Sequence, residues 1–339
     1  MHSQRKLDHL RVCLEENVAF PSVTSGLERF RFVHQAVPEL ALDEIDLSYR
    51  FLGKELRAPL QISAMTGGTP SAEVINCNLA AAAQDVGVAM SVGSQRAALA
   101  DPALIATYQV RDVAPEILLF ANLGAVQLNY EYGVDDCQRA VDMIQADALI
   151  LHLNPLQECL QYDGNTNFGG LLRRIEQVCS KLTVPVVAKE VGWGLSGRAA
   201  QLLTDAGVRA LDVAGAGGTS WAQVEKLRLT DDALRRVSDS FMDWGISTAD
   251  SIRWVREVVP HIPIVASGGI RTGVEIAKAI CLGANVGAMA IPFLKLATVS
   301  SEQVIDRLRE IVLEMRIAML CSGARSLADL DSSRLYLAS

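Results

Sequence analysis

The stretch Ile150-Leu-His-Leu-Asn-Pro-Leu-Gln-Glu158 decides the fold that we predict for this chain. If residues 148–154 form a strand, alternation turns the leucines to one face and His152 and Asn154 to the other. Pro155 cannot continue a central strand, so this strand should end there. Parallel α/β proteins carry their active sites at the carboxyl ends of their strands. The stretch therefore predicts a buried strand that delivers polar side chains to a site.

The polar residues Gln157 and Glu158 are expected in the loop beyond this strand. Together with His152 and Asn154 they offer an imidazole, two carboxamides and a carboxylate. Such a set suits an anionic ligand, a divalent metal and a proton relay. A second interpretation stays open, in which His152 and Asn154 only satisfy polar positions in the interior.

From residue 58 onward, short apolar runs alternate with helical patterns, which is typical of successive βα units. The runs cover residues 59–64, 88–92, 118–122, 148–154, 185–191, 210–214, 263–267 and 284–291. These units predict an α/β protein with a TIM (β/α)8 barrel over residues 58–339. Residues 1–57 precede the repeat as an N-terminal arm of the kind that usually forms a plug or a mobile flap. Within the arm we expect a helix at residues 5–11 and a strand at residues 42–47.

The composition limits the class of protein. The chain has 339 residues, 50% hydrophobic and 5% aromatic, with 25 Gly, which favours a parallel sheet wrapped in helices. No long apolar stretch or signal peptide is visible, so we expect a cytoplasmic protein without membrane contact. A net charge of −8 argues against nucleic-acid binding and means that a polyanionic ligand needs local cations or a metal. Seven scattered cysteines predict reduced thiols.

Lys189 is a lone cation in the apolar fifth run, on the same face as Val187 and Val191. A buried lysine is costly unless it is paired or faces a ligand, so this position favours a functional role.

Two glycine-rich turns end the seventh and eighth runs: Ser267-Gly-Gly-Ile-Arg-Thr-Gly273 and Gly287-Ala-Met-Ala-Ile291. In a barrel these two turns meet and form a phosphate cup, where backbone N–H groups face the anion. The pair predicts a phosphorylated ligand.

The chain resembles a known family through a series of motifs that run in order over nearly its whole length. They are Arg5-Lys6, Met65-Thr-Gly-Gly68, Ser91-Val-Gly-Ser-Gln-Arg96, Asn122-Leu-Gly124, His152-Leu-Asn-Pro-Leu-Gln-Glu158, Lys189-Glu-Val-Gly192, Gly217-Gly-Thr-Ser-Trp221, Trp244-Gly-Ile-Ser-Thr248 and Ser267-Gly-Gly-Ile-Arg-Thr-Gly273. These motifs strongly resemble those of the type 2 isopentenyl diphosphate isomerases.

This resemblance implies an FMN-binding barrel of isoprenoid biosynthesis that interconverts isopentenyl and dimethylallyl diphosphate. It also implies Mg²⁺, NAD(P)H as the reductant that keeps the flavin reduced, and a homotetramer or homo-octamer. The implied reaction is a 1,3-allylic proton shift. Because the alkene has no polar group that the protein could bind, the diphosphate must provide the binding contacts.

The match to the family's motifs implies a role for each of three groups of residues. Those that hold FMN would be Ala64, Met65, Thr66, Ser94, Asn122, Lys189, Thr219, Gly268, Gly269, Ile270, Arg271, Ala290 and Ile291. Those that surround the substrate would be Arg5, Lys6, His9, Ser94, Gln95, Arg96, His152, Asn154 and Gln157, with Glu158 on the metal. Catalytic roles would fall to Gln157, Lys189, His152 and Trp221. Taken without the resemblance, Arg5, Lys6 and His9 fit a solvated charged face.

Competing interpretations remain. An FMN-dependent 2-hydroxy acid oxidase would need a His base late in the barrel, and His261 lies before its strand, at the wrong end. An inosine monophosphate dehydrogenase would need a nucleophilic Cys within residues 217–248, which contain none. A flavin-binding barrel without catalysis is the third alternative.

Overall fold

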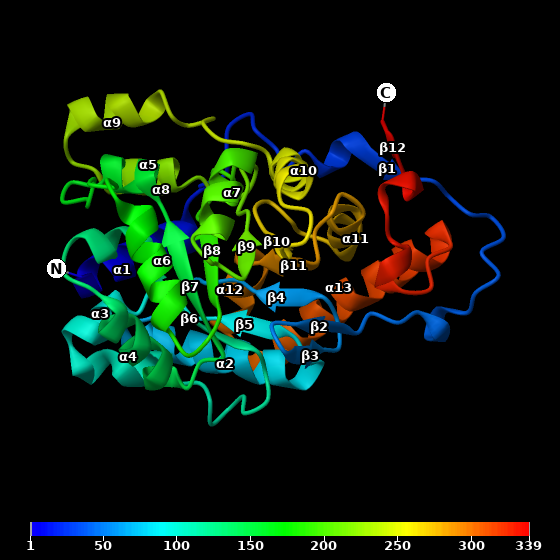
Figure 1. The fold of residues 1–339 in the computed structure, drawn as a ribbon, viewed down its shortest axis with the longest axis horizontal. Helices are drawn as coiled ribbons and strands as arrows, with labels where there is room; N and C mark the ends of the chain where they lie inside the picture. The colour runs from blue at the N-terminus through cyan, green and yellow to red at the C-terminus, as the bar shows by residue number, and fades with distance from the viewer. Residues whose placement is uncertain (1, 339) are drawn as a thin grey trace.

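Eight parallel strands close into a barrel in the computed structural model, which describes residues 2–338 (Figure 1). Around the barrel the strands follow the order β10-β11-β4-β5-β6-β7-β8-β9. Their bounds are β4 (Leu60–Ile62), β5 (Ala89–Ser91), β6 (Leu119–Gly124), β7 (Ala148–Leu153), β8 (Val186–Glu190), β9 (Ala210–Asp212), β10 (Ile264–Ala266) and β11 (Val286–Met289). The TIM barrel is confirmed, and each strand overlaps its predicted run.

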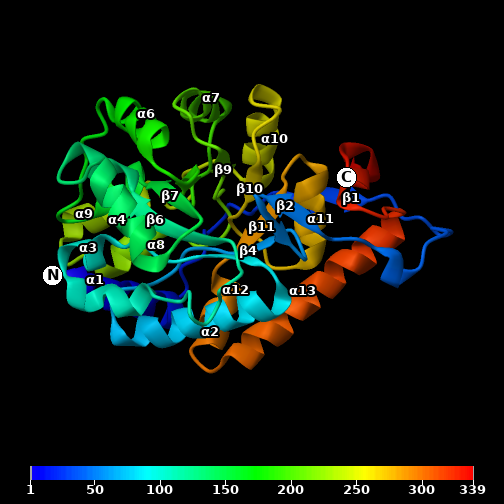
Figure 2. The same ribbon diagram turned by 60° about the horizontal axis from the view of Figure 1, so that its bottom comes forward.

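Helices surround this barrel and connect each strand to the next (Figure 2). The covering helices are α2 (Pro70–Val86), α4 (Val134–Ile144), α6 (Leu171–Lys181), α7 (Gly197–Asp205), α10 (Thr248–Val258), α11 (Gly273–Cys281) and α13 (Ser301–Ser322). Shorter helices lie in the connections: α3 (Arg96–Ala100), α5 (Pro155–Leu160), α8 (Trp221–Arg228), α9 (Asp232–Asp239) and α12 (Ile291–Ala297). No helix in the described part of the chain is long and apolar enough to cross a membrane.

Strand β7 shows how alternation builds the two layers of the core. Ala148 and Ile150 belong to the apolar cluster inside the barrel. Leu149 and Leu151 belong to the larger cluster between strands and helices. This confirms the predicted faces, because His152 continues the inner face and reaches the cavity at the end of the strand.

A β-hairpin closes the N-terminal end of the barrel. It consists of β2 (Tyr49–Phe51) and β3 (Lys54–Leu56), which pair antiparallel. Phe51 and Leu56 are buried in the inner cluster, and the Phe51 ring lies 6.2 Å from that of Phe120. We call this end of the molecule the floor of the barrel.

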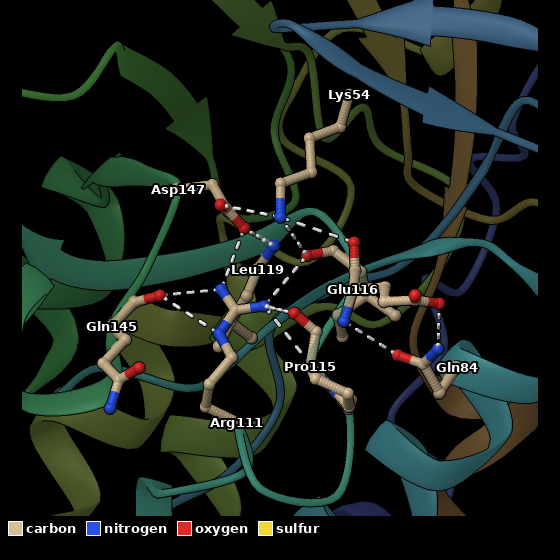
Figure 3. A network of polar contacts seen from close by, with 10 residues as sticks. Lys54, Gln84, Arg111, Pro115, Glu116, Leu119, Gln145 and Asp147 are labelled. Carbon is tan, nitrogen blue, oxygen red and sulfur yellow. Dashed lines mark hydrogen bonds and ion pairs between the residues drawn. The ribbon is translucent and has the colours of Figure 1, made fainter.

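The charged groups at the floor contact one another, as Figure 3 shows. Asp147 lies 2.9 Å from the Lys54 Nζ atom and 2.9 Å from the Arg111 Nη2 atom. Arg111 also donates to the carbonyl oxygens of Gln145 and Ile117. Every cation of this cluster therefore has a carboxylate partner.

The N-terminal arm reaches both ends of the barrel. Helix α1 (His2–Glu15) confirms the helix expected at residues 5–11 and lies at the end opposite the floor. Strand β1 (Phe30–Phe32) pairs antiparallel with β12 (Leu335–Leu337). The strand expected at residues 42–47 is wrong: Leu42–Glu44 form a 3-10 turn, and Asp46 makes only an isolated bridge. Alternation cannot form a strand where no neighbouring strand is available to pair.

Candidate active site

A cavity of about 280 Å³ lies at the C-terminal end of the barrel, where residues at or just beyond the ends of all eight strands line it. Helix α1 adds another part of its wall. Every predicted site residue except Gln95 lines this cavity: Arg5, Lys6, His9, Ala64, Met65, Thr66, Ser94, Arg96, Asn122, His152, Asn154, Gln157, Glu158, Lys189, Thr219, Trp221, Gly268, Gly269, Ile270, Arg271, Ala290 and Ile291. The structure thus brings these residues together, and their individual roles remain predictions.

The position of the Gln95 side chain does not agree with the prediction that it contacts the substrate. Its side chain is fully buried and lies outside the cavity lining. Its Oε1 atom accepts from the backbone N–H of Asn122 at 2.9 Å, and its Nε2 atom donates to the carbonyl of Ala140 at 2.8 Å. Both polar ends are therefore used to tie β5 to its neighbours. Gln95 lies directly before α3 as its N-cap residue, and its side chain is directed away from the cavity.

Lys6 is the most unusual charge in the cavity. Its Nζ atom donates to the carbonyl of Ser94 at 2.7 Å and to the hydroxyl of Tyr108 at 2.5 Å. Burial, together with the neighbouring charge of Arg5, lowers the pKa of Lys6 to about 7. Both partners are neutral, so this ammonium group lacks the anion that a buried cation ordinarily requires.

Arg5 and Arg96 lie near Lys6 and are also held by neutral groups. Arg5 donates to Oε1 of Gln161 at 2.9 Å, and Arg96 donates to Oδ1 of Asn165 at 3.3 Å. Among the ion pairs of the described residues, none includes Lys6, Arg5 or Arg96. Burial lowers the pKa of Arg5, as does the charge of Arg96. The three cations form one positive patch, which we call the cationic mouth.

His152 stands in the cavity as a neutral imidazole. Burial and the charges of Lys189, Lys6 and Arg5 together lower its pKa to about 3. Its Nδ1 atom lies 2.8 Å from Oδ1 of Asn122 on the adjacent strand. This contact fixes the orientation of the ring. His152 is therefore suited to hydrogen bonding rather than to carrying a positive charge.

Gln157 and Glu158 lie on helix α5 rather than in the expected loop. Pro155 occupies the first turn of that helix, where its missing N–H removes no hydrogen bond. Asn154 donates to Oε1 of Gln157 at 3.1 Å and to Oε1 of Glu158 at 3.0 Å. The backbone N–H of Asn165 donates to the other Glu158 oxygen at 2.6 Å. These contacts fix both side chains at the cavity wall.

Glu225 is a site residue that the sequence did not reveal. It lies on α8 with its side chain 1% exposed, and it accepts from Gln157 at 2.9 Å. His9 lies 3.0 Å away and Arg228 2.6 Å away. Burial alone raises the pKa of Glu225, but the hydrogen bonds from His9 and Gln157 and the charge of Arg228 outweigh it and lower the pKa. The available signal was its spacing of four residues from Trp221, which puts both on one helix face.

Trp221 and His9 form the part of the wall above Glu225. Their rings pack edge to face with centroids 5.1 Å apart. Helix α1 is therefore attached to α8 through a ring contact and a buried carboxylate.

Lys189 reaches the cavity from β8 and remains largely buried. Its Nζ atom donates to the carbonyl of Glu190 at 2.8 Å and lies 3.5 Å from Oδ2 of Asp212. Burial raises the pKa of Glu190 to about 7, although the next three backbone N–H groups donate to its Oε2 atom at 2.6 to 2.7 Å. Glu190 faces this turn and does not line the cavity.

The turn after β10 fits a phosphate group. Gly268 and Gly269 have φ values of 105° and 74°, and a Cβ on Gly268 would lie 2.1 Å from the carbonyl oxygen of Gly215. Only glycine fits there. The turn leads into α11, and the start of a helix favours an anion. Burial lowers the pKa of Arg271, whose side chain lies beside the turn. This backbone cradle matches what the phosphate of FMN requires.

The donor set also fits a magnesium ion that is shared with a ligand. Glu158 is the one carboxylate residue among the described residues that line the cavity. Nearby, Oδ1 of Asn154 and Oε1 of Gln127 are buried without a hydrogen-bond partner. No group of three or more His, Cys, Asp or Glu residues gathers into a metal site within residues 2–338. Mg²⁺ commonly binds through one or two carboxylates and the phosphates of its substrate, which suits this arrangement.

Comparison with known proteins identifies the family. The FMN-dependent dehydrogenase family matches residues 160–337. An isopentenyl-diphosphate delta-isomerase from Nostoc sp. is 54% identical and covers 97% of this chain and 94% of its own length. One from Synechococcus sp. is 56% identical over 95% of this chain and 92% of its own. One from Rickettsia felis is 50% identical over 98% of this chain and 96% of its own length.

Solved structures agree on the fold. A mandelate oxidase superposes with a TM-score of 0.68 at 17% identity, covering 99% of this chain and 94% of its own. A flavocytochrome b2 superposes with a TM-score of 0.68 at 17% identity, and the match covers 97% of this chain and 83% of the flavocytochrome chain. At this identity they support the barrel alone. From the close relatives, the matched FMN family and the cavity that gathers the motifs, the chain belongs to the type 2, FMN-dependent isopentenyl-diphosphate delta-isomerases.

Proposed function

We propose that this protein interconverts isopentenyl diphosphate and dimethylallyl diphosphate with reduced FMN bound in the barrel. The observation that carries the proposal is the cationic mouth. Lys6, Arg5 and Arg96 face one cavity and are held there by neutral groups. A diphosphate supplies the anion that these cations lack.

The substrate site extends from the cationic mouth to α5. Beside the three cations, His9, Ser94, His152, Asn154 and Gln157 would surround the substrate, and Glu158 would hold Mg²⁺ against its phosphates. The grip on the diphosphate positions a hydrocarbon that has no polar group of its own. The N-terminal arm would thus complete the site through α1.

The cofactor site lies around the glycine turns and Lys189. The residues that would hold FMN are Ala64, Met65, Thr66, Ser94, Asn122, Lys189, Thr219, Gly268, Gly269, Ile270, Arg271, Ala290 and Ile291. When bound, reduced FMN would supply the acid and base for the 1,3-allylic proton shift. Lys189 stabilises negative charge on the reduced ring.

The other members of the proposed catalytic set act on the substrate side. Neutral His152 donates or accepts a hydrogen bond without adding charge. Gln157, bound to buried Glu225, orients a proton beside the hydrocarbon. Trp221 provides an aromatic wall for it. We further propose NAD(P)H as the reductant, a homotetramer or homo-octamer, and a cytoplasmic location.

A 2-hydroxy acid oxidase is the second candidate, because such enzymes use the same barrel. That chemistry needs an imidazole base in the cavity near the late strands. His261 is exposed, precedes β10 and does not line the cavity. The position of His261 therefore favours the isomerase.

The test is turnover by the purified protein with FMN, Mg²⁺ and NADPH under anaerobic conditions. We expect a yellow protein that bleaches on reduction and converts isopentenyl diphosphate. A protein that binds FMN but leaves this substrate unchanged, or that oxidises a 2-hydroxy acid, would contradict the proposal. A matched reaction without reductant shows whether turnover requires the reduced flavin.

A further inference from the structure

Three side chains on neighbouring strands form a polar chain beneath the cavity. Lys189 of β8 pairs in register with Asp212 of β9, and their Nζ and Oδ2 atoms lie 3.5 Å apart. Ser267, which follows β10, donates from its hydroxyl to Oδ1 of Asp212 at 2.5 Å. Lys189 and Ser267 line the cavity, and Asp212 does not. Asp212 can therefore affect a ligand only through its neighbours.

The two oxygens of Asp212 have different surroundings. Oδ1 accepts from Ser267 and, at 3.2 Å, from the backbone N–H of Ala214. Oδ2 is buried and has no hydrogen-bond partner. A purely structural role for the turn after β9 would need only Oδ1, and an asparagine could fill it. The negative charge on the second oxygen is accounted for by the ammonium group of Lys189.

Lys189 has one charged partner within 4 Å among the described residues, and that partner is Asp212. Both side chains are almost fully buried, at 9% and 1% exposure, so solvent screens their interaction weakly. An ammonium group that faces a flavin favours the reduced ring, on which negative charge accumulates. A carboxylate directly behind that group opposes the effect.

We propose that Asp212 is a positioning residue that holds Lys189 toward the FMN ring and offsets part of its charge. It thereby sets how much more tightly the site binds reduced FMN than oxidised FMN. This inference rests on the proposed function, because it requires a flavin in the cavity.

The experiment measures the midpoint potential of bound FMN in the wild type and in Asp212→Asn. Asparagine keeps the Oδ1 acceptor and removes the charge. We expect the preference for reduced FMN to increase about tenfold, which equals a shift of about 30 mV to less negative potential for a two-electron couple. The matched control is Asp147→Asn, which removes a lysine-paired carboxylate at the floor and should leave the potential unchanged.

An unchanged potential in Asp212→Asn, or an equal shift in Asp147→Asn, would overturn the inference. If Asp212→Asn does not fold, the comparison is made between Lys189→Met and the double variant Lys189→Met/Asp212→Asn, which contains no unpaired charge. We expect the double variant to have the less negative potential, and equal values would refute the offset. A wild type without bound FMN would instead contradict the proposed function.

Discussion

The floor and the cationic mouth, at opposite ends of the barrel, hold their cations in opposite ways. At the floor, Lys54 and Arg111 share the carboxylate of Asp147, and backbone carbonyls take the remaining donors (Figure 3). At the cavity, Lys6 is held by a carbonyl and a phenol alone. A cation that has its anion contributes to folding, whereas a cation without one is kept at a cost to stability. The difference indicates which end is built for the fold and which for a ligand.

Replacing Lys6 should give the largest effect at the mouth. Lys6→Met removes the buried ammonium group but keeps most of its volume. We expect kcat/KM for isopentenyl diphosphate to fall roughly 100-fold, because a hydrogen bond to a charged group contributes about 1.5–3 kcal/mol. The melting temperature of the ligand-free protein should not fall. A variant with normal KM and lower stability would place Lys6 with the structural charges of the floor.

Replacing Arg111 is the corresponding change at the floor. Arg111→Met leaves Asp147 with one cation instead of two and leaves several carbonyl groups without their donor. We expect unfolding in urea to need about 2 kcal/mol less free energy, with kcat and KM unchanged. A change in KM would show that the two ends are not independent.

Glu158 tests whether the negative charge at the mouth serves a metal. Glu158→Gln keeps the size of the side chain and one acceptor oxygen, which can serve either Asn154 or the N–H of Asn165 but not both. We expect the Mg²⁺ concentration for half-maximal activity to increase about tenfold, since a magnesium ion loses its protein carboxylate. Asp163→Asn is the control, because Asp163 is an exposed acid in the same connection. Equal metal dependence in the two variants would refute the assignment.

The pH dependence of binding should give the smallest effect. Burial and the charge of Arg5 lower the pKa of Lys6 from its ordinary 10.5 to about 7. Since a diphosphate requires the ammonium form, affinity for isopentenyl diphosphate should fall severalfold between about pH 7 and 8. Calorimetry on oxidised holoenzyme measures it, and the ratio to Lys6→Met cancels the titration of the ligand. The same ratio at both pH values would contradict the lowered pKa.

The stability of the folded protein should depend on pH in the opposite direction to the affinity for the diphosphate. Between about pH 7 and 10.5 the unfolded chain keeps a proton on Lys6 that the folded protein has lost. Stability conferred by this residue therefore rises with pH across that window. Urea unfolding of the wild type and Lys6→Met at two pH values measures this contribution.

Local patterns in the sequence determined most of the barrel. Alternation predicted that Lys189 and His152 face inward, because a strand has a fixed period that tertiary packing does not alter. The side chain of Gln95 could not be placed, since it lies after the strand, where the following turn sets its direction. The role of Glu225 was also hidden, because its partners His9 and Gln157 are remote in sequence. Periodicity reports faces of elements, not which elements meet.

Phe51 and Leu56 fill the floor of the barrel, which limits how ligands can enter and leave. Because the floor is filled, cofactor and substrate must both enter at the C-terminal end, and the product must leave through the same opening. Helix α1 lies at that opening and contributes Arg5, Lys6 and His9 to its lining. We therefore expect the exchange of either ligand to require movement of this helix, while the eight strands stay in place.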